Sequence, residues 1–202
     1  SRTIIKLAEQ VFVMEHPALV LISLPSRAHS QRPPLGLMTI LAYLEKHGIR
    51  TELIDIKVND LQIVELNSPR AKEIEDQILK KLRTFKPKIV GLSAVTHEVE
   101  YVNELAKRIK QEVEAKIIVG GQHASLAADD FIFPESAVDF VVVGEGEESF
   151  RELARAIMDE KPLESFEQIK SIVFLDKGKL FRTALRPLIE PLDEVPMPAY
   201  DR

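Results

Sequence analysis

The sequence contains no cysteine among its 202 residues. This absence excludes disulfides, thiolate nucleophiles, cysteine-based zinc sites and iron–sulfur clusters held by this chain. Long apolar runs are also missing, because none approaches the roughly 18 to 20 residues that span a bilayer. The N-terminus does not show the basic and apolar regions of a signal peptide. We therefore expect no membrane span and a cytoplasmic location.

The sequence also has little excess of charge of either sign. The formal net charge is -5, and the Lys and Arg residues are scattered among Asp and Glu. No basic cluster is interleaved with aromatic residues, so we expect no nucleic-acid partner. The hydrophobic share of 45% is typical of a globular protein and is enough for a core of ordinary size.

Short β-branched runs alternate with helical patterns along most of the chain. This alternation predicts an α/β fold with a parallel sheet and right-handed crossovers. We expect a flavodoxin-like or Rossmann-like sheet of five strands in the order 2-1-3-4-5, with helices on both faces. The strands are expected at 18–23, 51–56, 89–93, 116–119 and 140–143, and the helices at about 36–47, 71–85, 96–113, 124–131 and 147–158.

The pattern changes beyond residue 160. Two apolar runs flank D-K-G-K at 176–179, which predicts a β-hairpin. Four prolines within twelve residues then favour an extended tail, either docked on the domain surface or poorly ordered. We therefore divide the chain into an N-terminal extension (1–17), with helical spacing in 2–15, a Rossmann-like domain (18–160), and a hairpin and linker (161–202).

Adjacent glycines mark the candidate ligand site. The strand expected at 116–119 ends on Gly120 and Gly121, where a bulky ligand can lie directly against bare backbone. The carboxyl ends of the strands in such a sheet form the crevice where ligands bind. Ser93 and Thr96 follow the neighbouring strand, so their hydroxyl groups are either helix starters or hydrogen-bonding partners of a ligand.

Two other features have competing interpretations. G-E-G-E-E-S at 144–149 half matches a dinucleotide loop, but its carboxylates would face a pyrophosphate, so helix capping is the better interpretation. Backbone contact of Gly144 and Gly146 with a ligand is compatible with that role. The five histidines are dispersed and predict no metal site. His97 and His123 follow strands on the predicted edge, as caps or loop residues or, less favoured, as ligand contacts.

Several segments together resemble a known family. They are P-P-L-G-L at 33–37, L-I-D at 53–55, K-P-K-I-V-G-L-S at 86–93, I-I-V-G-G-Q-H-A at 117–124 and V-D-F-V-V-V-G-E-G-E at 138–147. In this order they resemble the N-terminal cobalamin-binding domain of cobalamin-dependent radical SAM enzymes, a family that includes the anaerobic magnesium-protoporphyrin monomethyl ester cyclases. Residues 191–201 resemble the connector before the radical SAM barrel.

The resemblance implies that cobalamin binds with its dimethylbenzimidazole tail slotted into this domain. It implies no catalytic residue in this chain. The cofactor-binding residues that it implies are Ser93, Val95, Thr96, Gly120, Gly121, Gln122, His123, Gly144 and Gly146. Of these, Gly121 is the position where we expect an added side chain to intrude most directly on the cofactor without harm to the fold.

The sequence departs from the family in one place. Classical cobalamin domains carry D-x-H-x-x-G after the first strand, whereas this chain reads S-R-A-H-S-Q-R around His29. The Asp and Gly that would aim an imidazole at cobalt are absent, so we expect base-off cobalamin without a protein histidine ligand. The alternative is a domain that has lost cobalamin and acts in substrate recognition or scaffolding.

The resemblance also implies a larger enzyme. A radical SAM domain would follow in the same polypeptide, with an iron–sulfur cluster and S-adenosylmethionine, and would act on a small-molecule substrate by methyl transfer or oxidative cyclisation. This chain would then be the non-catalytic cofactor module. Nothing in its residues selects a substrate.

Overall fold

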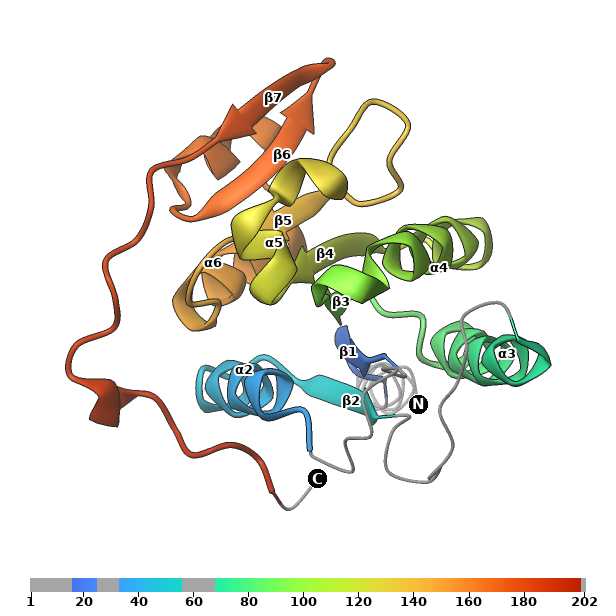
Figure 1. Ribbon diagram of the computed structural model, residues 1–202. Helices are drawn as coiled ribbons and strands as arrows, with labels where there is room; N and C mark the ends of the chain where they lie inside the picture. Colours follow the sequence, from blue (N-terminus) through green and yellow to red (C-terminus); the bar gives the residue numbers. More distant parts are fainter. Residues whose placement is uncertain (1–15, 25–32, 56–67, 201–202) are drawn as a thin grey trace, which may run out of the picture.

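The computed structural model describes residues 16–24, 33–55 and 68–200. They form one sheet in the order β2-β1-β3-β4-β5-β6-β7 (Figure 1). The first five strands are parallel, and the last two are antiparallel to their neighbours. The strands are β1 (Leu19–Ser23), β2 (Thr51–Asp55), β3 (Ile89–Ser93), β4 (Lys116–Gly120), β5 (Phe140–Val142), β6 (Ile172–Asp176) and β7 (Lys179–Arg182).

The predicted order of the five parallel strands is confirmed, and so is the C-terminal hairpin. The structure adds one thing: β6 pairs with β5, so the hairpin extends the sheet. Lys177 and Gly178 connect β6 and β7 with φ values of 49° and 78°. Two successive residues with positive φ are typical of a two-residue hairpin turn whose twist matches that of the flanking strands.

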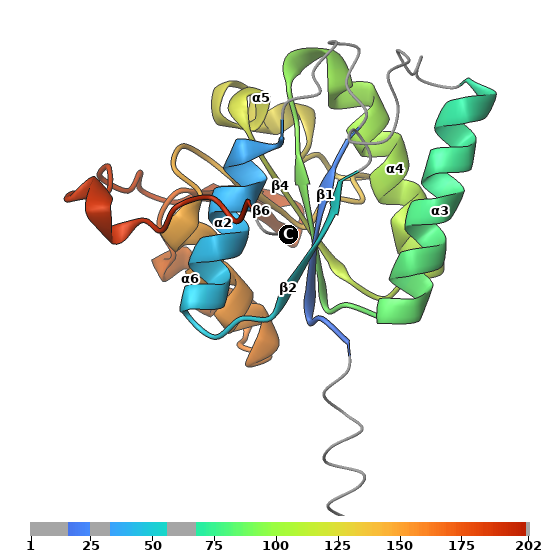
Figure 2. The same ribbon diagram turned by 90° about the horizontal axis from the view of Figure 1, so that it is seen from below.

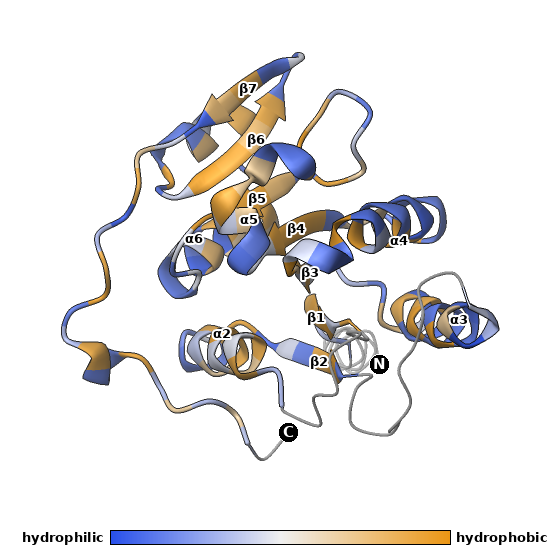
Figure 3. Cartoon of the chain, viewed as in Figure 1, coloured by the Kyte–Doolittle hydropathy of each residue, from blue (hydrophilic) through white to orange (hydrophobic). Residues whose placement is uncertain are grey.

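Two helical layers cover the sheet (Figure 2). Alternate residues of β1 point to opposite faces, so Leu19 and Leu21 join the core under α2 and α6, whereas Val20 and Ile22 join the core under α3 and α4. Figure 3 shows the apolar strands enclosed by helices with polar outer faces. The helices are α2 (Leu35–Lys46), α3 (Pro69–Phe85), α4 (Val99–Glu112), α5 (Gln122–Leu126) and α6 (Glu147–Met158).

Two helices differ from their predicted extents. The segment expected as one helix over 96–113 begins with a 3₁₀ turn, Thr96–Glu98, because the Glu98 carboxylate accepts the Val95 N–H at 3.2 Å and holds a tight first turn. The helix expected at 124–131 is split into α5 and a 3₁₀ turn, Ala128–Asp130. Asp130 is held there by its hydrogen bonds to His123 and Asn103.

The proline-rich tail lies along the outside of α6 and α2. The Ile189 N–H donates to Glu145 at 2.8 Å, Lys46 donates to the Glu194 carbonyl at 2.7 Å, and the Ala199 N–H reaches the Met38 carbonyl at 3.3 Å. These contacts dock the tail on the domain surface. The predicted helix at 2–15 and the loop that contains His29 lie outside the described residues.

Candidate functional site

A pocket of about 220 Å³ opens at the carboxyl end of the sheet, on the face covered by α2 and α6. Six of the eight glycines in the sequence line it, so much of its wall is bare backbone. Its apolar wall comes from the strands and the two helices. The lining residues are Leu21, Gly36, Leu37, Ile40, Gly91, Leu92, Ser93, Gly120, Gly121, Val142, Gly144, Glu145, Gly146, Glu147 and Phe150.

The alternation of side chains along the strands explains the position of the pocket. In β4, Ile118 packs under α2 and α6, so Gly120, two residues later, faces the same side. A Cβ atom built on Gly120 would have no neighbour closer than the Val142 carbonyl oxygen at 3.9 Å. The space that a side chain would fill at Gly120 is therefore open to a ligand.

The protein's own backbone leaves no room for a side chain at Gly121. Its φ of 103° and ψ of -175° lie in a region that is essentially restricted to glycine. A Cβ atom there would approach the Ala94 carbonyl oxygen at 2.7 Å and its nitrogen at 2.9 Å. The expectation that Gly121 tolerates a side chain without harm to the fold is therefore wrong, because that side chain would collide with the backbone after β3.

Backbone hydrogen bonds hold the loops after β3 and β4 together. The Ala94 N–H donates to the Gly120 carbonyl at 2.9 Å, and the His123 N–H donates to the Ala94 carbonyl at 3.2 Å. The close approach at Gly121 follows from this pairing. It places the Ser93 hydroxyl within 2.9 Å of the position that a Gly121 Cβ would occupy, at the edge of the pocket.

The structure brings together five of the nine predicted site residues. Ser93, Gly120, Gly121, Gly144 and Gly146 line the pocket, whereas Val95, Thr96, Gln122 and His123 are not among its lining residues. His123 is buried and lies edge-on to Phe131. Its ring nitrogens contact the Thr96 hydroxyl at 3.1 Å and the Asp130 carboxylate at 2.7 Å. His123 and Thr96 therefore connect the segments after β4 and β3 without lining the pocket.

Sequence reasoning missed the part of the pocket that the helices contribute. Gly36, Leu37 and Ile40 come from the first turns of α2, and Glu147 and Phe150 from α6. The sequence predicts only helix capping for the carboxylates of 144–149, and Glu147 does lie in the first turn of α6. The available signal was the glycines themselves, because Gly36 and Gly91 stand within two of the segments that carry the family resemblance.

A polar cluster connects the two helices that flank the pocket. The Tyr43 hydroxyl of α2 donates to the Glu148 carboxylate of α6 at 2.8 Å, and Arg151 donates to the same carboxylate at 2.7 and 2.5 Å. The Arg151 hydrogen bond, with a smaller contribution from Tyr43, lowers the pKa of Glu148 to about 2. Burial and the Glu148 hydrogen bond raise the pKa of Tyr43 to about 12.

The Glu148 cluster should make stability depend on pH in the acid range. A carboxylate with a lowered pKa stabilises the fold fully above its unfolded value of 4.5, and this contribution is lost as the pH falls towards about 2. We expect Glu148→Gln to lower the free energy of unfolding by about 2 kcal/mol at neutral pH. Urea unfolding of both proteins between pH 7 and pH 3 tests this, and a difference that does not shrink below about pH 4.5 would contradict it.

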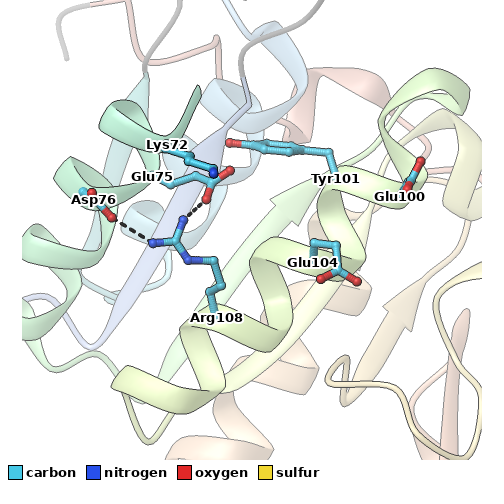
Figure 4. Close-up of a pocket in the computed structure, with 7 residues that line it drawn as sticks. All are labelled: Lys72, Glu75, Asp76, Glu100, Tyr101, Glu104 and Arg108. Atoms are coloured by element: carbon cyan, nitrogen blue, oxygen red, sulfur yellow. Dashed lines mark hydrogen bonds and ion pairs between the residues drawn. The ribbon is translucent and has the colours of Figure 1, made fainter. Parts of the chain in front are cut away.

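A second pocket, of about 360 Å³, lies between α3 and α4 on the opposite face. Figure 4 shows Arg108 of α4 reaching across to Glu75 and Asp76 of α3, the latter at 2.8 Å. The Tyr101 hydroxyl is buried without a hydrogen-bond partner among the described residues, and its burial raises the pKa of Tyr101. Because ion pairs already engage Arg108 and the phenol is sealed from solvent, we do not assign a ligand here.

Two kinds of site are missing from the part of the chain that the structure describes. No three His, Asp or Glu side chains lie together so that they could hold a metal ion. None of the described helices is both long enough and apolar enough to cross a membrane. We take the pocket beside Gly120 as the candidate site because glycines line it and it lies at the carboxyl ends of the strands.

Comparisons with known proteins identify the family of the chain. The family model of the B12-binding domain matches residues 24–154, which is more than half of the chain. An uncharacterized methyltransferase of Pyrococcus horikoshii is 31% identical over 84% of this chain and 34% of its own length. An anaerobic magnesium-protoporphyrin IX monomethyl ester cyclase of Cereibacter sphaeroides is 31% identical over 59% of this chain and 20% of its own length.

A solved structure shows the same fold. TsrM, a radical S-adenosylmethionine methyltransferase from Kitasatospora setae with cobalamin and a [4Fe-4S] cluster bound, superimposes with a TM-score of 0.64 at 18% identity. The match covers 90% of this chain and 31% of TsrM. The chain thus spans about a third or less of these relatives. On the strength of the family match over residues 24–154, it belongs to the family of B12-binding domains.

Proposed function

We propose that this chain binds cobalamin by taking its nucleotide tail into the pocket between α2 and α6. The observation that carries the proposal is the gathering of six glycines around one pocket. A flat heterocycle needs bare backbone above and below it and few protruding side chains. At Gly36 and Gly120 an added Cβ would meet nothing within 4 Å or only one atom at 3.9 Å, so the space for such a ring is open.

The lining residues divide into two groups. Leu37, Ile40 and Phe150 supply an apolar wall for the heterocycle, and the Ser93 hydroxyl supplies a hydrogen-bonding group at its edge. The pocket's volume of about 220 Å³ suits the tail rather than the whole cofactor. When bound, cobalamin supplies the reactive chemistry through its cobalt ion, and the protein supplies binding and orientation.

We further propose that the cofactor is bound base-off, because its tail would lie in the pocket, and that no histidine of this chain ligates the cobalt ion. Both ring nitrogens of His123 already contact protein groups, the Thr96 hydroxyl and the Asp130 carboxylate, so neither is available to cobalt. His29 stands in S-R-A-H-S-Q-R, without the Asp that would orient a ligating imidazole. Its loop lies outside the described residues, so this part of the proposal rests on the sequence.

Titration of the chain with hydroxocobalamin, followed by absorption spectroscopy, tests the proposal. We expect saturable binding, with the bands of the base-off form, and no change of these bands in His29→Ala. Bands that do change in His29→Ala would overturn the proposal that no histidine ligates the cobalt ion. No binding, either by this chain or by the full-length protein, would overturn the proposed function and favour the second candidate.

That second candidate is a domain that has kept the fold but lost the cofactor and serves in substrate recognition or scaffolding. The observation in its favour is the absent D-x-H-x-x-G motif. We favour the first candidate because the pocket has open space at Gly36, Gly120 and Gly144, where an added Cβ would meet at most one atom within 4 Å. The titration separates the two.

For the whole protein, we propose a radical SAM domain downstream of this module, with an iron–sulfur cluster and S-adenosylmethionine, and a small-molecule substrate. Support comes from the similar proteins, which include methyltransferases and a cyclase that are longer than this chain. Because this chain has no cysteine, such a cluster would be held elsewhere in the polypeptide.

A further inference from the structure

The short helix α5 (Gln122–Leu126) carries a serine that connects two walls of the pocket. The Ser125 hydroxyl donates to the Gly121 carbonyl at 3.0 Å and accepts the Gly144 N–H at 2.9 Å. Gly121 begins the loop after β4, and Gly144 lies in the loop after β5. One hydroxyl thus bridges two loops that are 23 residues apart in the sequence and adjacent at the sheet edge.

Hydrogen bonds hold the residues on either side of Gly144: the Val143 N–H donates to the Ser171 carbonyl at 2.9 Å, and Glu145 accepts the Ile189 N–H at 2.8 Å. Gly144 itself is held differently. A Cβ atom built on Gly144 would meet no atom within 4 Å, so the residue is not packed against a neighbour. Its φ of 76° favours glycine, which is also the least restricted residue in the unfolded chain. Among the described residues, its N–H makes no hydrogen bond other than the one to Ser125.

We propose that Ser125 is a positioning residue that sets the separation between the Gly121 and Gly144 walls of the cofactor pocket. This inference rests on the proposed function and extends it to a side chain that does not line the pocket. Without the hydroxyl, the Gly144 loop loses its attachment to α5 and samples wider openings. The bound tail then has to order that loop, which weakens binding.

Three variants test the role of the hydroxyl. Ser125→Ala removes both hydrogen bonds, whereas Ser125→Thr keeps an oxygen that can make them. Ser136→Ala is the matched control, because the Ser136 hydroxyl also bridges two backbone groups, donating to the Phe131 carbonyl at 2.5 Å and accepting the Val138 N–H at 3.0 Å. Ser136 lies outside the pocket lining.

Two readouts apply. In the cofactor-free chain, we expect amide exchange at Gly144, measured by NMR, to be roughly 2- to 10-fold faster in Ser125→Ala and restored in Ser125→Thr. In titrations with hydroxocobalamin, we expect the dissociation constant to rise by roughly 3- to 10-fold in Ser125→Ala and to stay unchanged in Ser136→Ala. The Thr variant should bind as the wild type does.

The outcomes separate this inference from the function on which it rests. If the wild type binds cobalamin and Ser125→Ala binds equally well, the positioning role is wrong while the proposed function stands. An equal loss of affinity in Ser136→Ala would also overturn it, because the effect would then follow stability alone. If the wild type binds no cobalamin, the proposed function fails, and the positioning role falls with it whatever the exchange rates are.

Discussion

Replacing Gly120 with leucine should abolish cobalamin binding and leave the fold intact. The Cβ at this position has no neighbour closer than 3.9 Å, so the backbone does not need to move. Gly120 faces the pocket, and a leucine side chain would occupy a large part of its volume of about 220 Å³. A loss of at least about 100-fold in affinity is expected, because the tail and the side chain compete for one space.

The measurement is a hydroxocobalamin titration, with circular dichroism and urea unfolding to check the fold. Gly120→Ala is the graded control: its single methyl group should fit and weaken binding far less. Wild-type affinity in Gly120→Leu would place the cofactor elsewhere. Loss of the folded state in that variant would show that the space beside Gly120 is needed by the protein itself.

At the adjacent position, even alanine should be harmful to the fold. Gly121→Ala is expected to lower the free energy of unfolding by roughly 3 kcal/mol, the sum of a strained backbone conformation and a close contact. The strain comes from the φ of 103°, and the contact from the Ala94 carbonyl oxygen 2.7 Å from the new Cβ. Cobalamin binding would fall as a secondary effect of the displaced loop.

Urea unfolding of the cofactor-free chain measures this difference directly. Gly120→Ala again provides the comparison, because it adds the same atom one residue earlier in open space. We expect the two alanine variants to differ by at least about 2 kcal/mol. Equal stability of the two would contradict this, because the Gly121 backbone would then relax to an ordinary conformation and the Ala94 backbone would move away from the new Cβ.

The fold was predictable because its signals are local and repeated. Each buried parallel strand is a short β-branched run, and each long helix has apolar residues on one face. The pairing of β6 with β5 was not predictable in the same way. Attachment of a hairpin to a sheet edge is a long-range contact, and the apolar run of Phe140–Val142 does not reveal which side has a neighbour.

The site was predictable only along its strand edge. Gly120 and Gly144 follow apolar strands, and sequence periodicity reveals that edge. The contributions of α2 and α6 depend on how those helices cross the sheet, which no spacing encodes. The expectation that the fold tolerates a side chain at Gly121 was wrong for a related reason: whether a missing side chain leaves room for a ligand or for the protein's own backbone depends on the neighbouring loop at Ala94.

The pairing of β6 and β7 onto β5 also bears on solubility. β7 forms the outer edge of the sheet and carries Lys179 and Arg182, and charged side chains on an edge strand discourage pairing between copies. A chain cut before residue 171 would instead expose the apolar β5 (Phe140–Val142) as an open edge. By covering the edge of β5, the hairpin therefore protects the domain against self-association, and we expect a version without it to aggregate.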